Sequence, residues 1–212
     1  MIKFFNLIVI FLLLSCSSDT DLSKLKKIKD LYNSENNEVK RNLTRDIIKN
    51  INYPLILVNT NGLIKQSLML PISKRNGYDN YISGSGQGLT LNGANIIRSF
   101  GMNTNLLSMN IKGINIYSHS VPLKEWPSEI TKVYRFVTPE FKEKVIKFSC
   151  TLKQTKNEKI VIVEKNFFLT KINENCVSNE LSFQNVYWAS VEGFIWKSKQ
   201  WISLSNIFAE IS

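Results

Sequence analysis

From residue 54 onward the chain is a succession of short segments rich in β-branched and aromatic residues, each followed by Asn, Gly or Ser. Segments of this composition between turn-forming residues are typical of β-strands. No amphipathic pattern of about 10–15 residues separates them, so the alternation of strand and helix found in parallel sheets is not expected. We expect strands near residues 54–60, 63–71, 78–83, 88–92, 94–100, 105–110, 114–120, 130–138, 142–154, 159–170, 177–188, 192–198 and 200–211.

The segment 142–154 indicates how such a strand lies in its sheet. Its apolar residues take alternate positions and leave Lys, Ser and Thr between them: Ile146, Phe148, Cys150 and Leu152. Because successive side chains of a strand point to opposite faces, one face is predicted to be buried and the other solvated, as in antiparallel sheets.

Three dipeptides suit the tight turns of antiparallel hairpins. They are Asn61-Gly62, Asn76-Gly77 and Glu192-Gly193. A sheet of this many strands is not expected to stay flat and open. The predicted fold class is therefore mainly β: a curled antiparallel meander sheet, half-barrel or barrel-like, with one or two N-terminal amphipathic helices. The antiparallel β domain is assigned to residues 52–212.

The helical N-terminal segment is assigned to residues 22–51. Two apolar stripes at helical spacing support it, the second ending before Pro54: Leu22, Leu25, Ile28 and Leu31, then Val39, Leu43, Ile47 and Ile51. We favour packing of these helices on the β domain. The alternative is a basic amphipathic helix lying on a membrane surface.

The first sixteen residues resemble the leader and lipobox of bacterial lipoproteins. Lys3 precedes the apolar run 4–14, which is too short for a membrane span, and Ser15 precedes Cys16. The resemblance implies a signal peptide over residues 1–15, diacylglycerol and further acylation at Cys16, and a lipidated tether over residues 16–21. The alternative is an ordinary signal peptide with a chance cysteine.

The formal charge is +10, and removal of residues 1–15 takes away Lys3 alone, which leaves about +9. An exported basic protein meets anionic lipid headgroups or an acidic polysaccharide, and no nucleic acid partner is expected. A solvated basic surface without a specific partner is the simpler interpretation.

Cys150 and Cys176 remain after lipidation of Cys16, in a compartment where disulfides form. If the meander turns near Lys156-Asn157 and Glu174, the two residues lie roughly 30 Å apart along their strands. We therefore predict two free thiols.

No catalytic constellation is recognised. His119 is the only histidine, and its neighbours Ser118 and Ser120 point to the opposite face of a strand. No pair of Asp or Glu residues stands out as the carboxylates of a glycosidase. The segment 84–88 lacks the Lys and the following helix of a phosphate loop. We predict a protein that is not an enzyme, without metal or cofactor.

Four aromatic residues gather in the last strands: Tyr187, Trp188, Trp196 and Trp201. Their rings either stack on sugars or fill the core, and we favour the core. Trp188 in particular is predicted to anchor the closing hairpin in the core.

Residues 187–200 resemble the closing hairpin of the YjbF/GfcB family of lipoproteins, known from group 4 capsule and exopolysaccharide operons. That hairpin typically reads Tyr-Trp-x-x-x-x-Gly-x-Ile-x-x-Ser-x-Gln, and this chain matches each specified position. Residues 92–106 are similar to the family's Gly-Arg-Ile-Val-x-Thr-x-Gly segment, with Ala94-Asn95 in place of the Arg and Ser99 in place of the Thr. No catalytic residue carries over.

The resemblance implies a lipoprotein on the periplasmic face of the outer membrane that serves capsule or exopolysaccharide export. Ser17 after the lipidated cysteine is consistent with sorting to that membrane. Its implied partners are an outer-membrane β-barrel protein and a periplasmic polysaccharide-export protein. The favoured function is a non-enzymatic accessory. The alternatives are a periplasmic glycan-active enzyme and an envelope assembly module that binds an outer-membrane protein through a sheet edge.

Overall fold

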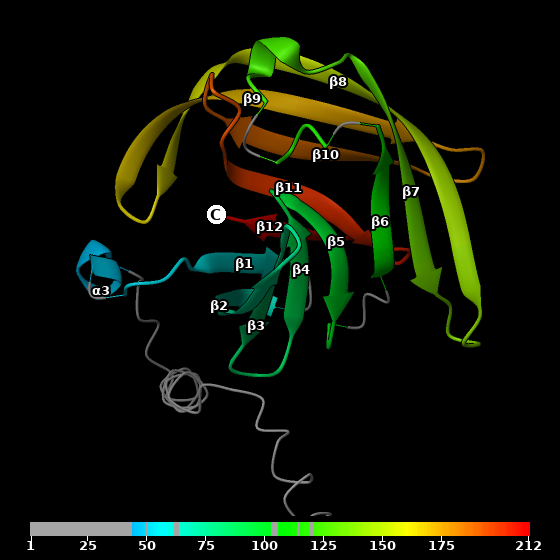
Figure 1. Ribbon diagram of the computed structural model, residues 1–212, viewed down its shortest axis with the longest axis horizontal. Helices are drawn as coiled ribbons and strands as arrows, with labels where there is room; N and C mark the ends of the chain where they lie inside the picture. The colour runs from blue at the N-terminus through cyan, green and yellow to red at the C-terminus, as the bar shows by residue number, and fades with distance from the viewer. Residues whose placement is uncertain (1–43, 50, 62–63, 103–105, 114, 119–120) are drawn as a thin grey trace, which may run out of the picture. The chain divides into compact units, whose positions relative to one another are not determined.

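The computed structural model describes residues 44–212, apart from 50, 62–63, 103–105, 114 and 119–120 (Figure 1). The described part holds the short helix α3 (Arg45–Lys49), the 3-10 helix η1 (Leu123–Glu125) and twelve strands. The strands are β1 (Ile56–Thr60), β2 (Ile64–Arg75), β3 (Tyr78–Ser83), β4 (Gly88–Asn92), β5 (Asn95–Phe100), β6 (Leu106–Lys112), β7 (Glu129–Val137), β8 (Glu143–Ile162), β9 (Lys165–Val177), β10 (Ser182–Ala189), β11 (Ile195–Ser203) and β12 (Ile207–Ile211). The predicted signal peptide, Cys16, the tether and most of the predicted helical segment lie outside the described residues.

All twelve strands belong to one antiparallel sheet, in the order β5-β4-β3-β2-β1-β12-β11-β10-β9-β8-β7-β6. Strands that follow one another in the chain pair with each other, apart from the edge strands β5 and β6, and β1 also pairs with β12. The sheet is thus two meanders joined by that pair, and its curl brings the edge strands β5 and β6 side by side (Figure 1). The predicted mainly β, curled, barrel-like meander is confirmed.

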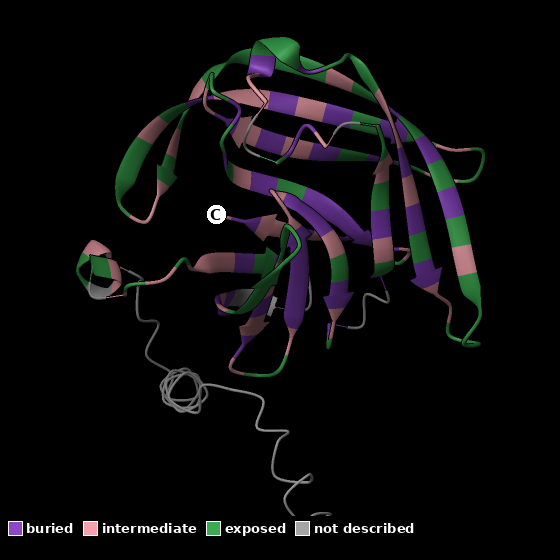
Figure 2. Cartoon of the chain, viewed as in Figure 1, coloured by how far each residue is buried: buried purple, intermediate pink, exposed green. Residues whose placement is uncertain are grey.

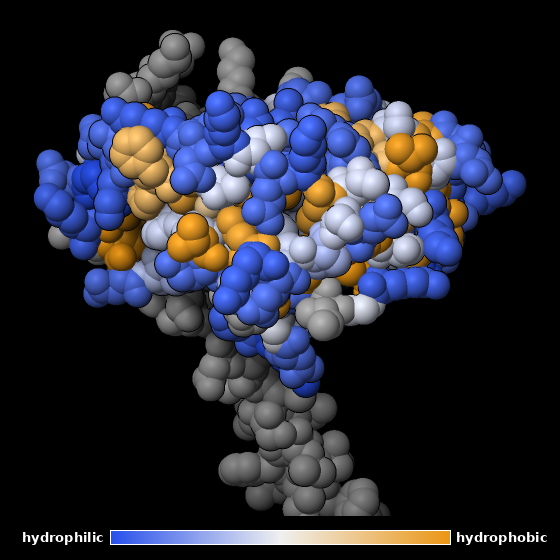
Figure 3. All heavy atoms as spheres, turned by 90° about the horizontal axis from the view of Figure 1, so that it is seen from above, coloured by the Kyte–Doolittle hydropathy of each residue, from blue (hydrophilic) through white to orange (hydrophobic). Residues whose placement is uncertain are grey.

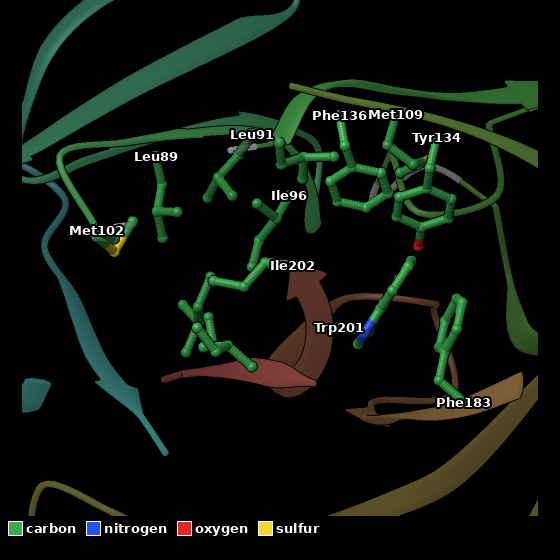
Figure 4. Packing of buried hydrophobic residues seen from close by; sticks show 14 of the residues in the cluster. Leu89, Leu91, Ile96, Met102, Met109, Tyr134, Phe136, Phe183, Trp201 and Ile202 are labelled. Atoms are coloured by element: carbon green, nitrogen blue, oxygen red, sulfur yellow. The ribbon is translucent and has the colours of Figure 1, made fainter. Parts of the chain in front are cut away.

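The inner face of the sheet holds the larger of two hydrophobic cores (Figure 2). Trp201 lies at the centre of its aromatic part, with its ring 4.4 Å from that of Phe183 and 5.3 Å from that of Tyr134 (Figure 4). Leu89 and Ile202 extend the same core toward β4 and β11. Tyr134 and Phe183 lie at inward positions of alternating strand segments, where hydrophobic burial and the period of two together set the register. Trp201 and Ile202 follow one another in β11 and are both buried, beside a register shift against β12.

The described residues between β6 and β7, which are 113, 115–118 and 121–128, form a cap over the second, smaller core. The predicted strand over 114–120 is therefore wrong for its described residues, 115–118, which form no strand. The cap contributes Ile116, Tyr117, Leu123 and Trp126 to the smaller core.

Two glycines hold the cap close to the hairpin turns beside it. A Cβ on Gly93, which has φ +61°, would lie 2.1 Å from the backbone oxygen of Tyr117, and one on Gly193, with φ +87°, would lie 1.9 Å from that of Val121. Only glycine permits both the left-handed conformation and this approach. Each glycine belongs to one of the two segments that carry the family resemblance.

Between residues 142 and 188 the strands follow the predicted meander order, but the hairpin β8–β9 contradicts the predicted positions of the turns. Its turn lies at Val163 and Glu164, which have positive φ angles, and not near residue 156. Cys150 is consequently paired with Cys176 directly across the two strands, with Cα atoms 4.0 Å apart, and the two form a disulfide.

The prediction of two free thiols is wrong because the turn was placed too early. Residues 153–157 are exposed and polar, as in a turn, yet they continue β8 with a bulge between Gln154 and Asn157. This part of β8 extends beyond β7, whose pairing with β8 ends at Thr151, and residues 153–157 are exposed on both faces, so no core imposes an alternating pattern there.

Candidate functional site

The four aromatic residues of the last strands divide between the two faces of the sheet. Tyr187 and Trp201 are buried in the smaller and the larger core, respectively. Trp188 is half-buried on the outer face, where its Nε1 donates a hydrogen bond to Glu158 and the ammonium of Lys197 lies 5.3 Å from its ring. Trp188 therefore lies outside the core, contrary to the prediction.

Trp196 also faces outward and is 40% exposed. Its ring lies 4.6 Å from that of Phe167 on β9 and 4.8 Å from that of Phe194, which precedes β11. The ammonium of Lys165 lies 5.2 Å from the Phe167 ring on the same hairpin. The rings of Phe167, Phe194 and Trp196 together are called the aromatic platform.

The aromatic platform forms one wall of a cleft of about 430 Å³. The cleft lies among α3, the start of β1, β3, β11 and the turn of the β8–β9 hairpin; Figure 1 shows α3, this turn and the C-terminal end of β12 on one side of the barrel. Its described lining is mainly apolar, and its charged side chains are Arg45, Asp79 and Lys197. The face seen in Figure 3 is mostly hydrophilic, with separate apolar patches.

Arg45 joins α3 to the turn of the hairpin. Its backbone N–H donates to Glu164 Oε2 at 3.0 Å, and its Nη2 donates to the carbonyl oxygen of Ile162 at 3.1 Å. Its Nε is buried and has no acceptor among the described residues. A guanidinium normally uses its donors as a fork, so this side chain retains capacity for an anion.

A second cluster of polar groups lies inside the barrel, around the ion pair of Lys132 and Glu174. Both side chains are 0% exposed, and Lys132 Nζ lies 2.8 Å from Glu174 Oε1. Tyr117 and Tyr187 donate their hydroxyls to the two carboxylate oxygens at 2.6 and 3.1 Å. Asn185 Nδ2 donates to Oε2 at 2.6 Å.

Burial controls the ionisation of this buried cluster. Desolvation lowers the pKa of Lys132, and the facing Glu174 carboxylate opposes that change. Desolvation raises the pKa of Tyr117 and of Tyr187 well above 10.0, and the negative charge of Glu174 raises both further. The cluster is therefore a salt bridge with neutral phenol donors, closed to solvent.

The sulfurs of Cys150 and Cys176 and a carboxylate oxygen of Glu174 lie within 4.8 Å of one another. Three such groups are a common set of metal ligands, but here the sulfurs are bonded to each other. We therefore assign this group to the stability of the barrel.

The buried ion pair was not predicted from the sequence, although a signal for it exists. Lys132 stands on the same alternating face as Tyr134 and Phe136, and Glu174 stands between Ile172 and Cys176. A charged residue at an inward position of each of two strands predicts a buried pair. His119, in contrast, lies outside the described residues.

No helix in the described part is long and apolar enough to cross a membrane. No curated protein matches the chain. Among solved structures, the hypothetical lipoprotein YmcC from Escherichia coli K12 is similar in fold, with a TM-score of 0.70 and 15% sequence identity over 93% of this chain and 96% of that one.

The comparison with protein families gives a match over residues 26–211, to the family described as group 4 capsule polysaccharide lipoprotein gfcB, YjbF. The match includes the two segments that meet the cap through Gly93 and Gly193. Since it extends over nearly all of the chain beyond the predicted tether, the chain belongs to the YjbF family of capsule polysaccharide lipoproteins.

Proposed function

We propose that this capsule-family lipoprotein is a non-enzymatic accessory in the assembly or export of a capsule or exopolysaccharide. The observation that carries the proposal is the family match over residues 26–211. In this proposal the lipid on Cys16 holds the domain at the periplasmic face of the outer membrane, where it meets the growing or emerging polymer.

The chemistry of the cleft supports an accessory role over a glycosidase. Glycoside hydrolysis uses two carboxyl groups, about 5–9.5 Å apart on either side of the scissile bond. Asp79 is the only carboxylate side chain among the described lining residues of the cleft. Glu174, the carboxylate with the most protein partners, is closed to solvent and paired with Lys132.

The partners stay part of the proposal. An outer-membrane β-barrel protein and a periplasmic export protein would receive the polymer or pass it on. The excess of basic residues favours an acidic polymer, because a net charge of +10 attracts polyanions at moderate salt.

The proposal is tested by deletion and complementation, with surface polysaccharide as the readout. The deletion strain is expected to lose surface polysaccharide, and the wild-type gene to restore it. Asp79→Asn keeps an acceptor oxygen but removes acid–base chemistry, so it is also expected to restore polysaccharide. An Asp79→Asn defect as severe as the deletion would support the enzyme instead, and a deletion with normal polysaccharide would overturn the proposed function.

The anchor is tested separately with Cys16→Ser. Radiolabelled palmitate is expected to enter the wild-type protein and not the variant, and only the wild type is expected to sediment with outer-membrane vesicles on a sucrose gradient. Label in the Cys16→Ser protein would contradict lipidation at this residue, and sedimentation of the wild type with the inner membrane would contradict the localisation.

A further inference from the structure

We propose that the cleft beneath the β8–β9 turn binds an acidic sugar residue of the polymer, with its ring on the aromatic platform and its carboxylate on Arg45. This inference rests on the proposed function, which supplies the polysaccharide. It adds the site and the chemical class of sugar.

The platform is suited to one face of a sugar ring. The ring of the half-exposed Trp196 lies 4.6 Å from that of Phe167 and 4.8 Å from that of Phe194, with the ring planes tilted by 35° and 59°. Such a group of tilted rings presents an apolar surface whose negative ring faces attract the weakly positive C–H groups of a pyranose. Tyr187 and Trp201 offer no such surface because both are buried.

Arg45 supplies the preference for an acidic sugar. Its Nη2 is held by Ile162, which fixes the plane of the guanidinium, and its buried Nε lacks an acceptor among the described residues. No carboxylate of a described residue makes an ion pair with this guanidinium, although Lys197, also in the cleft, pairs with Glu210 at 2.7 Å. A ligand carboxylate matches the remaining donors in geometry and in charge.

The size and the lining favour a sugar over an acyl chain. A volume of about 430 Å³ falls within the roughly 300–1,000 Å³ of small-molecule sites. An acyl chain would cover the Arg45 guanidinium without giving its remaining donors an acceptor, which is unfavourable. A sugar offers hydroxyls to Asp79 and a carboxylate to Arg45 while its C–H face covers the rings.

The test uses the lipidated mature protein in phosphatidylcholine nanodiscs. The probe is hexagalacturonate, a uronate oligosaccharide, and the matched neutral probe is maltohexaose. Affinities are measured by calorimetry at two salt concentrations. We expect the wild type to bind hexagalacturonate at least tenfold more tightly than maltohexaose, and the difference to shrink at the higher salt concentration.

Variants assign the binding to the cleft. Trp196→Ala and Arg45→Gln are each expected to weaken hexagalacturonate binding about tenfold or more, which is about 1.4 kcal/mol. Phe168→Ala is the matched control, because Phe168 is 74% exposed, adjoins Phe167 in the chain and is not among the lining residues of the cleft. The Phe168→Ala protein is expected to bind hexagalacturonate as tightly as the wild type. Phe167→Ala replaces Trp196→Ala if the latter does not show the cooperative thermal transition of the wild type.

Three results would overturn the inference. The first is no binding of hexagalacturonate by the wild type. The second is equal binding of hexagalacturonate by the wild type and both cleft variants. The third is that Trp196→Ala abolishes the binding of a fluorescent fatty acid while neither sugar displaces that fatty acid from the wild type. The last result would assign the cleft to an acyl chain. If the deletion strain still lacks polysaccharide, these results remove the sugar site and leave the proposed function intact.

Discussion

The barrel holds two groups of charged side chains, and they differ in what satisfies them. Around Lys132 and Glu174 the chain supplies the donors and acceptors itself, and the cluster is closed to solvent. In the cleft, Arg45 is held in place by the hairpin turn, but its Nε is left without an acceptor among the described residues. The comparison indicates that the buried pair serves the fold and that the cleft serves a ligand.

The largest effect is expected from breaking the buried pair. Lys132→Met leaves the Glu174 carboxylate buried without its counter-ion, and we expect it to lower the free energy of unfolding by about 3–5 kcal/mol. Urea denaturation of the purified protein measures the change. Adding Glu174→Gln is expected to recover much of the loss, because the remaining groups are then neutral.

The matched control for this prediction is a surface pair. Lys144 and Glu180 lie 2.6 Å apart at the surface, with their side chains 38% and 62% exposed. Lys144→Met is expected to cost about 0–1 kcal/mol, as exposed pairs usually do. Equal losses from Lys132→Met and Lys144→Met would contradict the role assigned to the buried pair.

The disulfide beside the buried pair is expected to rank second. It closes a loop with a sequence separation of 26 residues, for which loss of the link costs about 3 kcal/mol in unfolded-chain entropy. Melting the Cys150→Ala/Cys176→Ala variant beside the wild type measures the effect. Peptide mass spectra of the unreduced wild type should show the two cysteine peptides joined, and free thiols in the native protein would contradict this arrangement.

The glycines of the cap rank next. Gly193→Ala places a Cβ against the backbone oxygen of Val121, whereas Gly77→Ala, at a similar positive φ, meets open space. In each variant the positive φ is expected to lower the free energy of unfolding by about 1 kcal/mol, because alanine is unfavourable in that conformation. Gly193→Ala is expected to lower it further, because the cap must move. Thermal melts of the two compare them directly, and a smaller loss for Gly193→Ala would mean that the cap is not held at this turn.

The buried tyrosines are expected to matter least near neutral pH, because their effect is a dependence on alkaline pH. Three buried tyrosines have pKa values well above their ordinary 10.0 in the folded protein: Tyr117, Tyr134 and Tyr187. Above pH 10 the unfolded chain therefore binds fewer protons than the folded one. Stability should fall as the pH rises, by up to about 1.4 kcal/mol per pH unit for each tyrosine.

Lys132 changes stability in the opposite direction. Its pKa is lowered from 10.5, so the unfolded chain binds more protons between the folded pKa and 10.5, and stability rises with pH in that window. Urea midpoints at pH 8, 9.5 and 11, with tyrosinate absorbance in parallel, separate the two contributions. Tyr117→Phe should reduce the loss above pH 10; full ionisation of the tyrosines in the folded protein near pH 10 would contradict their burial.

The sequence predicts the barrel well where one face of a strand meets the core. Ile146, Phe148 and Cys150 alternate with polar residues, and all three are buried as the alternation requires. The prediction fails where β8 extends beyond β7, because residues 153–157 are exposed on both faces and no core imposes an alternating pattern on them. Its turn at Val163 and Glu164 also lacks the Asn-Gly signal that identifies the turn at Asn76-Gly77.

The candidate site is predicted only in part for a related reason. The aromatic cluster of the last strands already includes Trp196. Phe167 lies on β9 just after a turn that the sequence does not locate, and Arg45 lies on α3, so neither can be placed beside Trp196 from the sequence. The cleft is thus made by long-range contacts of three segments. A turn is predicted near Glu174 and no role is assigned to Lys132 from the sequence, so the buried pair is not predicted, although both residues stand at inward positions.

The most direct test compares the two regions in the deletion strain by measuring surface polysaccharide at equal protein levels. One variant neutralises the interior with Lys132→Met/Glu174→Gln, and the other alters the cleft with Arg45→Gln/Trp196→Ala. We predict that the interior variant restores polysaccharide to the wild-type level and that the cleft variant leaves it near that of the deletion. Full restoration by the cleft variant, with failure of a folded interior variant, would contradict the assignment of function to the cleft.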